Sequence, residues 1–395
     1  MAEFSKFEIL KEVEILLRSR DVANLLVNCI KKLCEKISED VRIMSFCGTH
    51  EWSVTNYGLR SLLPKKIEII AGPGCPVCVT PSYYIEELIK LSMDGVQIYT
   101  YGDVFRLPAV KLVRGAKSLE DAKALGGEVR VVTGLVDAIE LAKNCKDSIF
   151  VGIGFETVAP GYAHAILKDL IPKNLKILSL LKLTPPAMYF TVEKIDKDEK
   201  PLSGIIAPGH VSTIVGAKAW KKVAEDFRIP IVVAGFEPVD ILMAIAKILQ
   251  QIISGEAKVE LEYTRAVSYD GDLRAQKLLS SIFEAKEDAW RGIGFIPGSG
   301  LRINEGYRRY DAFEYFNIEE LRKSEWSYDL NAGCRCSDIV LGRAKPTDCK
   351  LFMRVCNPEN PYGPCMVSVE GTCSIWARFG AKEFTDDILE ELKLR

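Results

Sequence analysis

The stretch VRIMSFCG, at residues 41–48, is the first of seven short apolar runs that each end in a turn containing Gly or Pro. The other six are IEIIAGPG (67–74), VQIYTYGD (96–103), VRVVTG (129–134), SIFVGIG (148–154), SGIIAPG (203–209) and IPIVVAG (229–235). Valine and isoleucine are abundant in these runs, and most of the intervals between them have the length of a helix. Buried parallel strands that alternate with helices have this pattern. The sequence therefore predicts an α/β protein with two parallel-sheet domains.

The chain has 395 residues, which predicts two or three domains at roughly 150 residues each. We expect one α/β domain at residues 41–145 and a second at residues 146–323. Part of the second segment can fold back and contribute to the first domain. From residue 324 to residue 395 the sequence becomes rich in loops and cysteine. This module has too few periodic apolar residues for a core of its own, so it needs a metal or packing against the N-terminal helices at residues 1–40.

Composition excludes several classes of protein. Hydrophobic residues make up 48% of the chain and charged residues 27%, which is typical of a folded globular protein. The net charge is only -2, so binding to nucleic acid or to an anionic membrane surface is not expected. No apolar run has the length of a membrane span, and the N-terminus MAEFSKFEILKEVE lacks the apolar core of a secretory signal. We therefore expect a cytoplasmic protein, in which 12 cysteines indicate metal ligation or thiol chemistry.

Three reactive residue types lie at and just after the end of the first apolar run. Cys47, His50 and Glu51 lie within five residues of each other. A strand that ends in a turn places them at the carboxyl edge of a parallel sheet, where α/β proteins bind their ligands. The alternative is a buried Cys47 that acts as a small hydrophobic residue beside a surface glutamate.

A pair of cysteines follows the second run, in the segment GPGCPVC. Cys75 and Cys78 have the C-x-x-C spacing of a dithiol redox site, and a helix is predicted to start after Pro81. The same pair is also suited to holding a metal. The glycines before it allow a ligand to approach the backbone closely.

A carboxylate and a hydroxyl follow the run SIFVGIG. Glu156 and Thr157 would face a shared cleft at the strand end, or Glu156 would simply cap a helix. The glycines before them lack the third glycine of a dinucleotide fingerprint, so nucleotide binding is not expected. His210, which follows SGIIAPG, is compatible with a simple turn residue. His164 lies on a predicted helix and is a still weaker candidate for a functional residue.

Six cysteines lie within forty residues near the C-terminus. Cys336, Cys349, Cys356 and Cys373 offer four thiolates on loops, as a [4Fe-4S] cluster requires. Cys334 and Cys365 remain and are candidates for a redox-active disulfide. The spacing does not exclude Cys334 in place of Cys336 in the ligand set. A structural zinc site is the alternative to the cluster.

Six motifs together give the chain a family resemblance. The motifs FCGTHE, GPGCPVCVTP, GFETVAP, APGHVS, AGFEPVDIL and the C-terminal CRC...PYGPCMVSVEGTC resemble those of the HypD family of hydrogenase maturation factors, over residues 42–380. The resemblance implies a scaffold on which the Fe(CN)2CO unit of [NiFe]-hydrogenase is assembled. Its implied partners are a HypC-type chaperone and a HypE-type cyanide donor. It also implies two α/β domains and an iron-sulfur domain built from both chain ends.

The resemblance also implies roles for individual residues. Cys47 would hold the iron of the Fe(CN)2CO unit together with the HypC-type partner, and Cys75 and Cys78 would form a dithiol that exchanges electrons with the cluster. His50, Glu51, Glu156 and Thr157 would line the same cleft. Low-spin iron that carries cyanide and carbon monoxide favours soft donors, so a cysteine mount is chemically reasonable.

Three functions are therefore compared. The first is a redox-active scaffold for metallocentre assembly, which the motifs favour. The second is a cluster-dependent thiol-disulfide oxidoreductase that acts on a protein substrate through Cys75 and Cys78. The third is a structural zinc protein, which would be colourless, whereas an iron-sulfur protein absorbs visible light.

Overall fold

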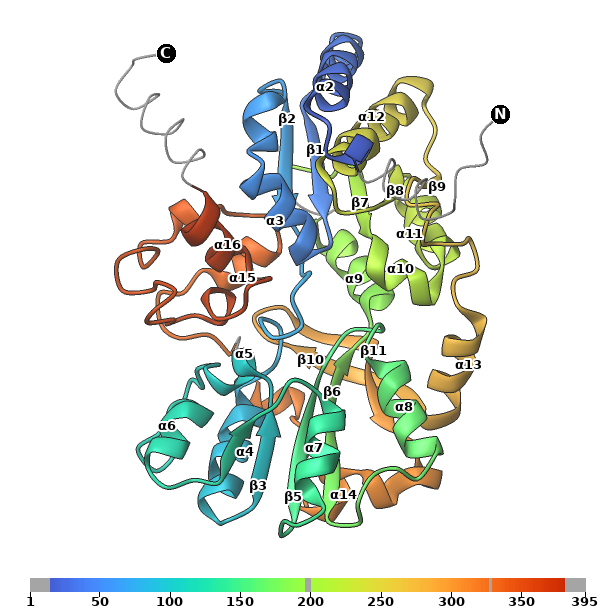
Figure 1. Cartoon of the computed structure of the whole chain (residues 1–395). Helices are drawn as coiled ribbons and strands as arrows, with labels where there is room; N and C mark the ends of the chain where they lie inside the picture. The colour runs from blue at the N-terminus through green and yellow to red at the C-terminus, as the bar shows by residue number, and fades with distance from the viewer. Residues whose placement is uncertain (1–14, 196–199, 327–328, 381–395) are drawn as a thin grey trace. The chain divides into compact units, whose positions relative to one another are not determined.

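The computed structural model describes residues 15–195, 200–326 and 329–380, and its chain divides into two compact units with one β-sheet each (Figure 1). Unit 1 consists of Met1–Gly74, Thr191–Gly271 and Ile375–Arg395. Unit 2 consists of Cys75–Phe190 and Asp272–Ser374. The predicted α/β class, with two sheets dominated by parallel strands, is confirmed.

Unit 1 contains a five-stranded parallel sheet with the strand order β2-β1-β7-β8-β9. Its strands are β1 (Val41–Ser45), β2 (Ile67–Ala71), β7 (Gly204–Pro208), β8 (Ile231–Ala234) and β9 (Val259–Leu261). Its helices are α2 (Arg20–Cys34), α3 (Gly48–Asn56), η1 (Leu59–Leu62), α10 (Gly209–Val215), η2 (Ala217–Trp220), α11 (Lys221–Phe227) and α12 (Pro238–Ser254). Because all five strands are parallel, the loops that follow them lie at one edge of the sheet.

Helix α2 lies beside α12 in unit 1 (Figure 1). It begins after Ser19, whose hydroxyl accepts a hydrogen bond from the backbone N–H of Val22. Val27 and Ile30 are buried in the same apolar core as Ile245 of α12. The N-terminal helices were expected to pack against the cysteine-rich module, whereas this helix belongs to the core of unit 1. The part of the expected helical segment before residue 15 lies outside the described residues.

Unit 2 contains a six-stranded sheet with the strand order β10-β11-β6-β5-β3-β4. Its strands are β3 (Gln97–Thr100), β4 (Val129–Val131), β5 (Ser148–Gly154), β6 (Leu175–Lys182), β10 (Phe283–Trp290) and β11 (Gly294–Ile303). Its helices are α4 (Ser82–Met93), α5 (Gly102–Phe105), α6 (Leu119–Ala124), α7 (Leu135–Ala142), α8 (Ala159–Leu167), α13 (Leu273–Ile282), η3 (Glu305–Tyr310), α14 (Ala312–Tyr315), η4 (Lys323–Glu325), α15 (Cys336–Val340), η5 (Pro346–Asp348) and η6 (Pro364–Met366). Strands β6, β5, β3 and β4 are parallel, while β10 and β11 join β6 as an antiparallel hairpin.

Two helices contain points at which the chain passes from one unit to the other. These are α9 (Thr184–Ile195) and α16 (Thr372–Phe379). The boundary expected near residues 140–148 falls inside unit 2, between α7 and β5. Residues 41–74 share a sheet with residues 204–261, because β1 pairs with β7. The segment from Cys334 to Ser374 belongs to unit 2.

A buried group of charges holds the hairpin to the parallel part of the sheet in unit 2. The Lys182 ammonium at the end of β6 donates to an Asp288 carboxylate oxygen at 2.5 Å, and Arg302 donates to both oxygens of Asp288 at 3.2 Å. All three side chains are buried. A buried charge is tolerated when it is paired and hydrogen-bonded, so these three residues position β10 and β11.

No helix in the described ranges is long and apolar enough to cross a lipid bilayer.

Candidate functional site

The first part of the candidate site lies where β1 ends in unit 1. Cys47 is the N-cap residue of α3 and is 2% exposed. Its sulfur lies 3.6 Å from Nδ1 of His210, which follows β7 at the start of α10. A helix N-terminus and a neighbouring imidazole are both common surroundings of reactive cysteines. The structure therefore places Cys47 at the predicted sheet edge and adds His210, whose place in the sequence suggests only a turn residue.

His50 lies in the first turn of α3 and is completely buried. Its Nε2 is 3.2 Å from the carbonyl oxygen of Ala234, which can only accept, so Nε2 carries the proton and Nδ1 accepts from the Ser45 hydroxyl at 3.3 Å. Burial, followed by the nearby His210, lowers the pKa of His50 to about 4. The ring is therefore neutral at pH 7 and joins the ends of β1 and β8.

An aromatic ring packs against both histidines. Phe236 follows β8, and its ring centroid is 5.1 Å from that of His50 and 5.6 Å from that of His210. This ring supports the face on which the Cys47 sulfur and His210 meet. Phe236 belongs to the motif AGFEPVDIL.

Glu51 has a full set of hydrogen-bond partners in unit 1. Its Oε1 accepts from the indole N–H of Trp376 at 2.7 Å and from the Thr55 hydroxyl at 3.2 Å, while Arg60 donates to both of its oxygens at 3.0 and 2.7 Å. The carboxylate is 1% exposed, and the Arg60 guanidinium also lies over the Trp376 ring. Glu51 therefore fastens the C-terminal helix α16 to α3, a structural role in addition to the one expected for it.

The loop after β2 packs tightly against Cys47. The backbone N–H of Gly48 donates to the carbonyl of Gly74 at 3.3 Å. A β-carbon on Gly74 would lie only 2.6 Å from the Cα of Cys47, so only glycine fits there. Gly74 is the residue that precedes Cys75 in the sequence.

Cys75 and Cys78 form a disulfide in unit 2. The backbone N–H of Cys78 also donates to the Cys75 sulfur at 3.2 Å. Both residues are buried, and α4 begins at Ser82 after Pro81, as the sequence predicts. The structure therefore brings the two predicted thiols into bonding contact.

Glu156 and Thr157 take different positions at the end of β5. Glu156 is completely buried, and its two oxygens accept from the backbone N–H and the hydroxyl of Thr184 at 2.6 and 2.9 Å. This arrangement caps the start of α9, which was the structural alternative for this residue. Thr157 is exposed.

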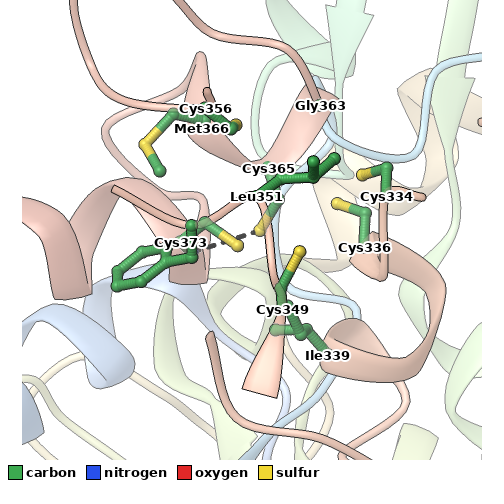
Figure 2. Close-up of a pocket in the computed structure, with 11 residues that line it drawn as sticks. Cys334, Cys336, Ile339, Cys349, Leu351, Cys356, Gly363, Cys365, Met366 and Cys373 are labelled. Atoms are coloured by element: carbon green, nitrogen blue, oxygen red, sulfur yellow. Dashed lines mark hydrogen bonds between the residues drawn. The ribbon is translucent and has the colours of Figure 1, made fainter. Parts of the chain in front are cut away.

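All six C-terminal cysteines line one pocket in unit 2 (Figure 2). They come from the loops around α15, η5 and η6 and from the start of α16. The other residues of this pocket are Ile339, Leu351, Phe352, Gly363 and Met366. In Figure 2 the sulfur atoms of Cys334 and Cys336 lie close together, as do those of Cys365 and Cys373. A sequence segment with few periodic apolar residues thus folds around a common sulfur-rich centre.

The pocket affects the acidity of its thiols unequally. The neighbouring thiols of Cys334 and Cys365, followed by burial, raise the pKa of Cys336 well above its usual range. Hydrogen bonds from the thiols of Cys336 and Cys373 hold the pKa of Cys365 well below its usual range, and the backbone N–H of Cys373 adds a bond of 3.3 Å. Burial raises the pKa of Cys356. The pKa of Cys365 is therefore shifted in the opposite direction from that of Cys356.

One glycine joins this pocket to the disulfide. A β-carbon on Gly371 would lie 2.2 Å from the carbonyl oxygen of Cys365 and 3.1 Å from the sulfur of Cys78. Gly371, which has no side chain, is therefore the residue that lies between the Cys75–Cys78 disulfide and the backbone of Cys365.

The donor set of the pocket fits a sulfur-ligated metal group. It offers six thiols, and the remaining side chains that line it are apolar, which is the environment of iron-sulfur clusters. In the described part of the chain, no three His, Cys, Asp or Glu side chains lie in the arrangement that would hold a single metal ion.

Comparison with known proteins decides the family. A family model described as "HypD: Hydrogenase formation hypA family" matches residues 21–380. The chain belongs to the HypD family of hydrogenase maturation factors. The resemblance inferred from the motifs is therefore confirmed.

Three relatives illustrate how far the similarity to HypD proteins extends. A putative hydrogenase expression/formation protein of Methanocaldococcus jannaschii is 42% identical over 357 residues, covering 89% of this chain and 96% of the relative. The hydrogenase maturation factor HypD2 of Bradyrhizobium diazoefficiens is 40% identical and covers 92% and 95% of the two chains. HypD of Azotobacter vinelandii is 40% identical and covers 86% and 89%. The similarity therefore includes both units and the cysteine-rich segment.

The structure of this HypD family member divides the predicted residues into two groups. One group is Cys47, His50 and Glu51 in unit 1, and the other is the Cys75–Cys78 pair with the C-terminal cysteines in unit 2. Two residues of interest were missed. His210 follows a predicted strand, which was the available signal, whereas the position of Gly371 depends on a contact with Cys78 that sequence spacing cannot show.

Proposed function

We propose that this hydrogenase maturation factor is the scaffold on which the Fe(CN)2CO unit of [NiFe]-hydrogenase is assembled. Its partners in this proposal are a HypC-type chaperone, which shares the iron, and a HypE-type cyanide donor. The observation that carries the proposal is the convergence of six cysteines on one pocket beside the Cys75–Cys78 disulfide, in a chain of the HypD family.

Cys47 is the proposed mount for the iron of the Fe(CN)2CO unit, which is cargo. Its sulfur is a soft donor, which suits low-spin iron with cyanide and carbonyl ligands. His210 Nδ1, 3.6 Å from this sulfur, orients the thiol and receives its proton when the iron binds. The close packing of Gly74 fixes the backbone of Cys47, so the sulfur is held in one position.

The cysteine pocket is the proposed site of a [4Fe-4S] cluster, which would supply single electrons. The ligand set expected from spacing is Cys336, Cys349, Cys356 and Cys373, with Cys334 as the alternative to Cys336. Both Cys334 and Cys336 line the pocket, so either of them can supply the fourth thiolate. The remaining one of the two would then pair with Cys365 as the redox-active dithiol.

The Cys75–Cys78 disulfide is the proposed electron-pair store. Its reduction takes two electrons and two protons and yields two thiols. The contact between Gly371 and the Cys78 sulfur supports electron exchange with the pocket, because it leaves a short path between the two sites. A store of this kind serves the reductive ligand chemistry that assembly of the iron unit requires.

A cluster-dependent thiol-disulfide oxidoreductase is the second candidate function, since the structure joins Cys75 and Cys78 in a disulfide. Anaerobic purification after co-expression with the two partners separates the candidates. The scaffold carries one iron beyond the cluster and shows cyanide and carbonyl infrared bands. The oxidoreductase carries cluster iron only, and a zinc protein shows no visible absorption.

A further inference from the structure

The loop of residues 349–356 covers the cysteine pocket in unit 2. Its two ends are Cys349 and Cys356, and Leu351 and Phe352 between them also line the pocket. Figure 2 shows Leu351 among the pocket cysteines. The next residue along the chain, Met353, is 49% exposed. The 349–356 loop therefore has the pocket on one side and solvent on the other.

Backbone hydrogen bonds hold the 349–356 loop in one conformation. The backbone N–H groups of Arg354 and Cys356 both donate to the carbonyl of Leu351, at 3.2 and 2.9 Å. The backbone N–H of Met353 donates to the carbonyl of Cys356 at 2.9 Å. Met353 has a positive φ of 55°, which closes the turn. The outer surface of the loop is therefore preformed, and a partner that binds to it does not have to order the chain first.

The solvent side of the 349–356 loop combines positive charge with apolar side chains. Lys350 and Arg354 are exposed, and neither forms an ion pair with any residue that the structure describes. Met353 and Val355 are 49% and 51% exposed. Residues 343–356 include four basic residues and one acidic residue, whereas the whole chain has a net charge of -2. A locally positive surface of this kind attracts acidic proteins.

We propose that the 349–356 loop is the docking surface for a small acidic electron-carrier protein. The proposal rests on the proposed function, in which the cysteine pocket receives single electrons. Lys350 and Arg354 would steer the acidic carrier toward the loop, and Met353 and Val355 would form the apolar contact. Encounters between electron carriers and their partners bury little surface, less than about 1,200 Å², so a short loop and its surroundings are large enough.

The position of the 349–356 loop suits the transfer of electrons, because a carrier docked there is separated from the pocket only by the chain that lines it. Each docked carrier is oxidised by one electron. Two carriers supply the two electrons that, with two protons, convert the Cys75–Cys78 disulfide into two thiols. The cluster proposed for the pocket would supply one-electron chemistry that matches such a carrier. The loop itself binds and orients the carrier.

The test measures the binding of an acidic [2Fe-2S] ferredoxin in which gallium replaces iron, so that no electron is transferred. Isothermal titration calorimetry with the anaerobically purified full chain gives the dissociation constant. We expect the double variant Lys350→Glu and Arg354→Glu to bind about tenfold more weakly than wild type at low salt. Raising the ionic strength from about 0.01 to 0.15 M should also weaken wild-type binding by about tenfold, because the charges are screened.

The matched control is the double variant Arg274→Glu and Lys277→Glu, which makes the same change in net charge on α13. Both side chains are exposed and form no ion pair within the described part of the chain. Helix α13 packs against α8 (Figure 1), whereas the residues that line the pocket lie between Cys334 and Cys373. The control should change the dissociation constant by less than about threefold. No binding by wild type at low salt, unchanged binding in the loop variant, or an equal loss in the control would overturn the proposal.

Met353→Asn tests the apolar contact without a change in charge, and it decides the matter if the charge-reversed loop does not fold. Asparagine tolerates the positive φ at this position, so the turn is kept. We expect binding to weaken by about three- to tenfold. The visible absorption and the thermal unfolding of the variant show that the pocket is intact. Binding equal to that of wild type in this folded variant would overturn the proposal.

A second readout follows electron transfer in the same variants. Stopped-flow reduction by the iron form of the ferredoxin should slow in proportion to the loss of binding. Photoreduced deazaflavin, a small reductant that needs no docking surface, should bleach the visible absorption of all variants at the same rate. Binding of the gallium ferredoxin does not depend on Cys47. Loss of the infrared bands with binding intact would therefore reject the scaffold alone, whereas loss of binding with the bands intact would reject the docking surface alone.

Discussion

The sulfur of Cys78 lies 3.1 Å from the position that a β-carbon on Gly371 would take. Gly371 thereby brings the Cys75–Cys78 disulfide and the backbone of Cys365 close together. Both sites belong to unit 2, so the relationship is a property of one folded unit. It connects the Cys75–Cys78 pair with the C-terminal cysteines, which are more than 250 residues away in sequence.

Gly371→Ala should destabilise unit 2, because the added methyl group would lie 2.2 Å from the Cys365 carbonyl oxygen. We expect a loss of about 1–3 kcal/mol in the free energy of unfolding, typical of overpacking. Urea unfolding measures it. Gly161→Ala is the control, since a β-carbon there meets nothing within 4 Å and alanine favours helix α8. Equal stability of Gly371→Ala and wild type would show that the contact is loose.

Cys356→Ser should bleach the visible absorption of the purified protein and lower its iron content. Cys356 lies in the ligand set under either assignment, and a serine oxygen is a harder donor than the thiolate it replaces. The exposed Cys29 gives the control variant Cys29→Ser, which should leave the spectrum unchanged. An intact spectrum in Cys356→Ser would remove this residue from the ligand set.

His50 should make unit 1 less stable in acid. Its pKa is about 4 in the folded chain against 6.5 for free histidine, so the folded state resists protonation. The stability is fully present above pH 6.5 and is lost as the pH falls toward 4, by about 3 kcal/mol in total. Unfolding of His50→Gln should depend less on pH in this window. The control is His164→Gln, at an exposed position of α8. Identical pH profiles of His50→Gln and wild type would contradict this account.

Glu51→Gln distinguishes a structural from a catalytic role. The amide keeps an acceptor for Trp376 but leaves the partly buried Arg60 without its ion pair, so we expect a loss of about 2–3 kcal/mol in stability. Asp270→Asn removes the exposed pair with Lys218 and should cost less than about 1 kcal/mol. If Glu51→Gln abolished assembly of the iron unit at full stability, Glu51 would instead act in the chemistry.

Seven strands were predictable because each is an apolar run that ends in a turn, and β1, β2, β3, β4, β5, β7 and β8 confirm them. Strand β6 was missed because Lys176 and Lys182 interrupt its apolar pattern, although both are buried. Strands β10 and β11 carry the charged residues Asp288 and Arg302, whose burial depends on Lys182. The division into units was not predictable, because β1 pairs with β7 from a distant part of the chain.

The candidate site was predictable as a set of residue types but not as a set of contacts. Cysteine spacing indicates a common pocket for the six C-terminal thiols, and they share one. Spacing does not show that Glu51 binds Trp376 and Arg60. His210 could be recognised only once β1 and β7 were known to be neighbours, because its imidazole meets Cys47 across these strands.

The most direct measurement of the central claim is the infrared spectrum of the chain purified anaerobically with its two partners. Wild type and the control Cys29→Ala should show cyanide and carbonyl bands. Cys47→Ala should lose these bands while the visible absorption of the cysteine pocket persists. Bands that survive in Cys47→Ala would contradict the role of this thiol, and a wild-type complex with cluster absorption but without bands would contradict the scaffold itself.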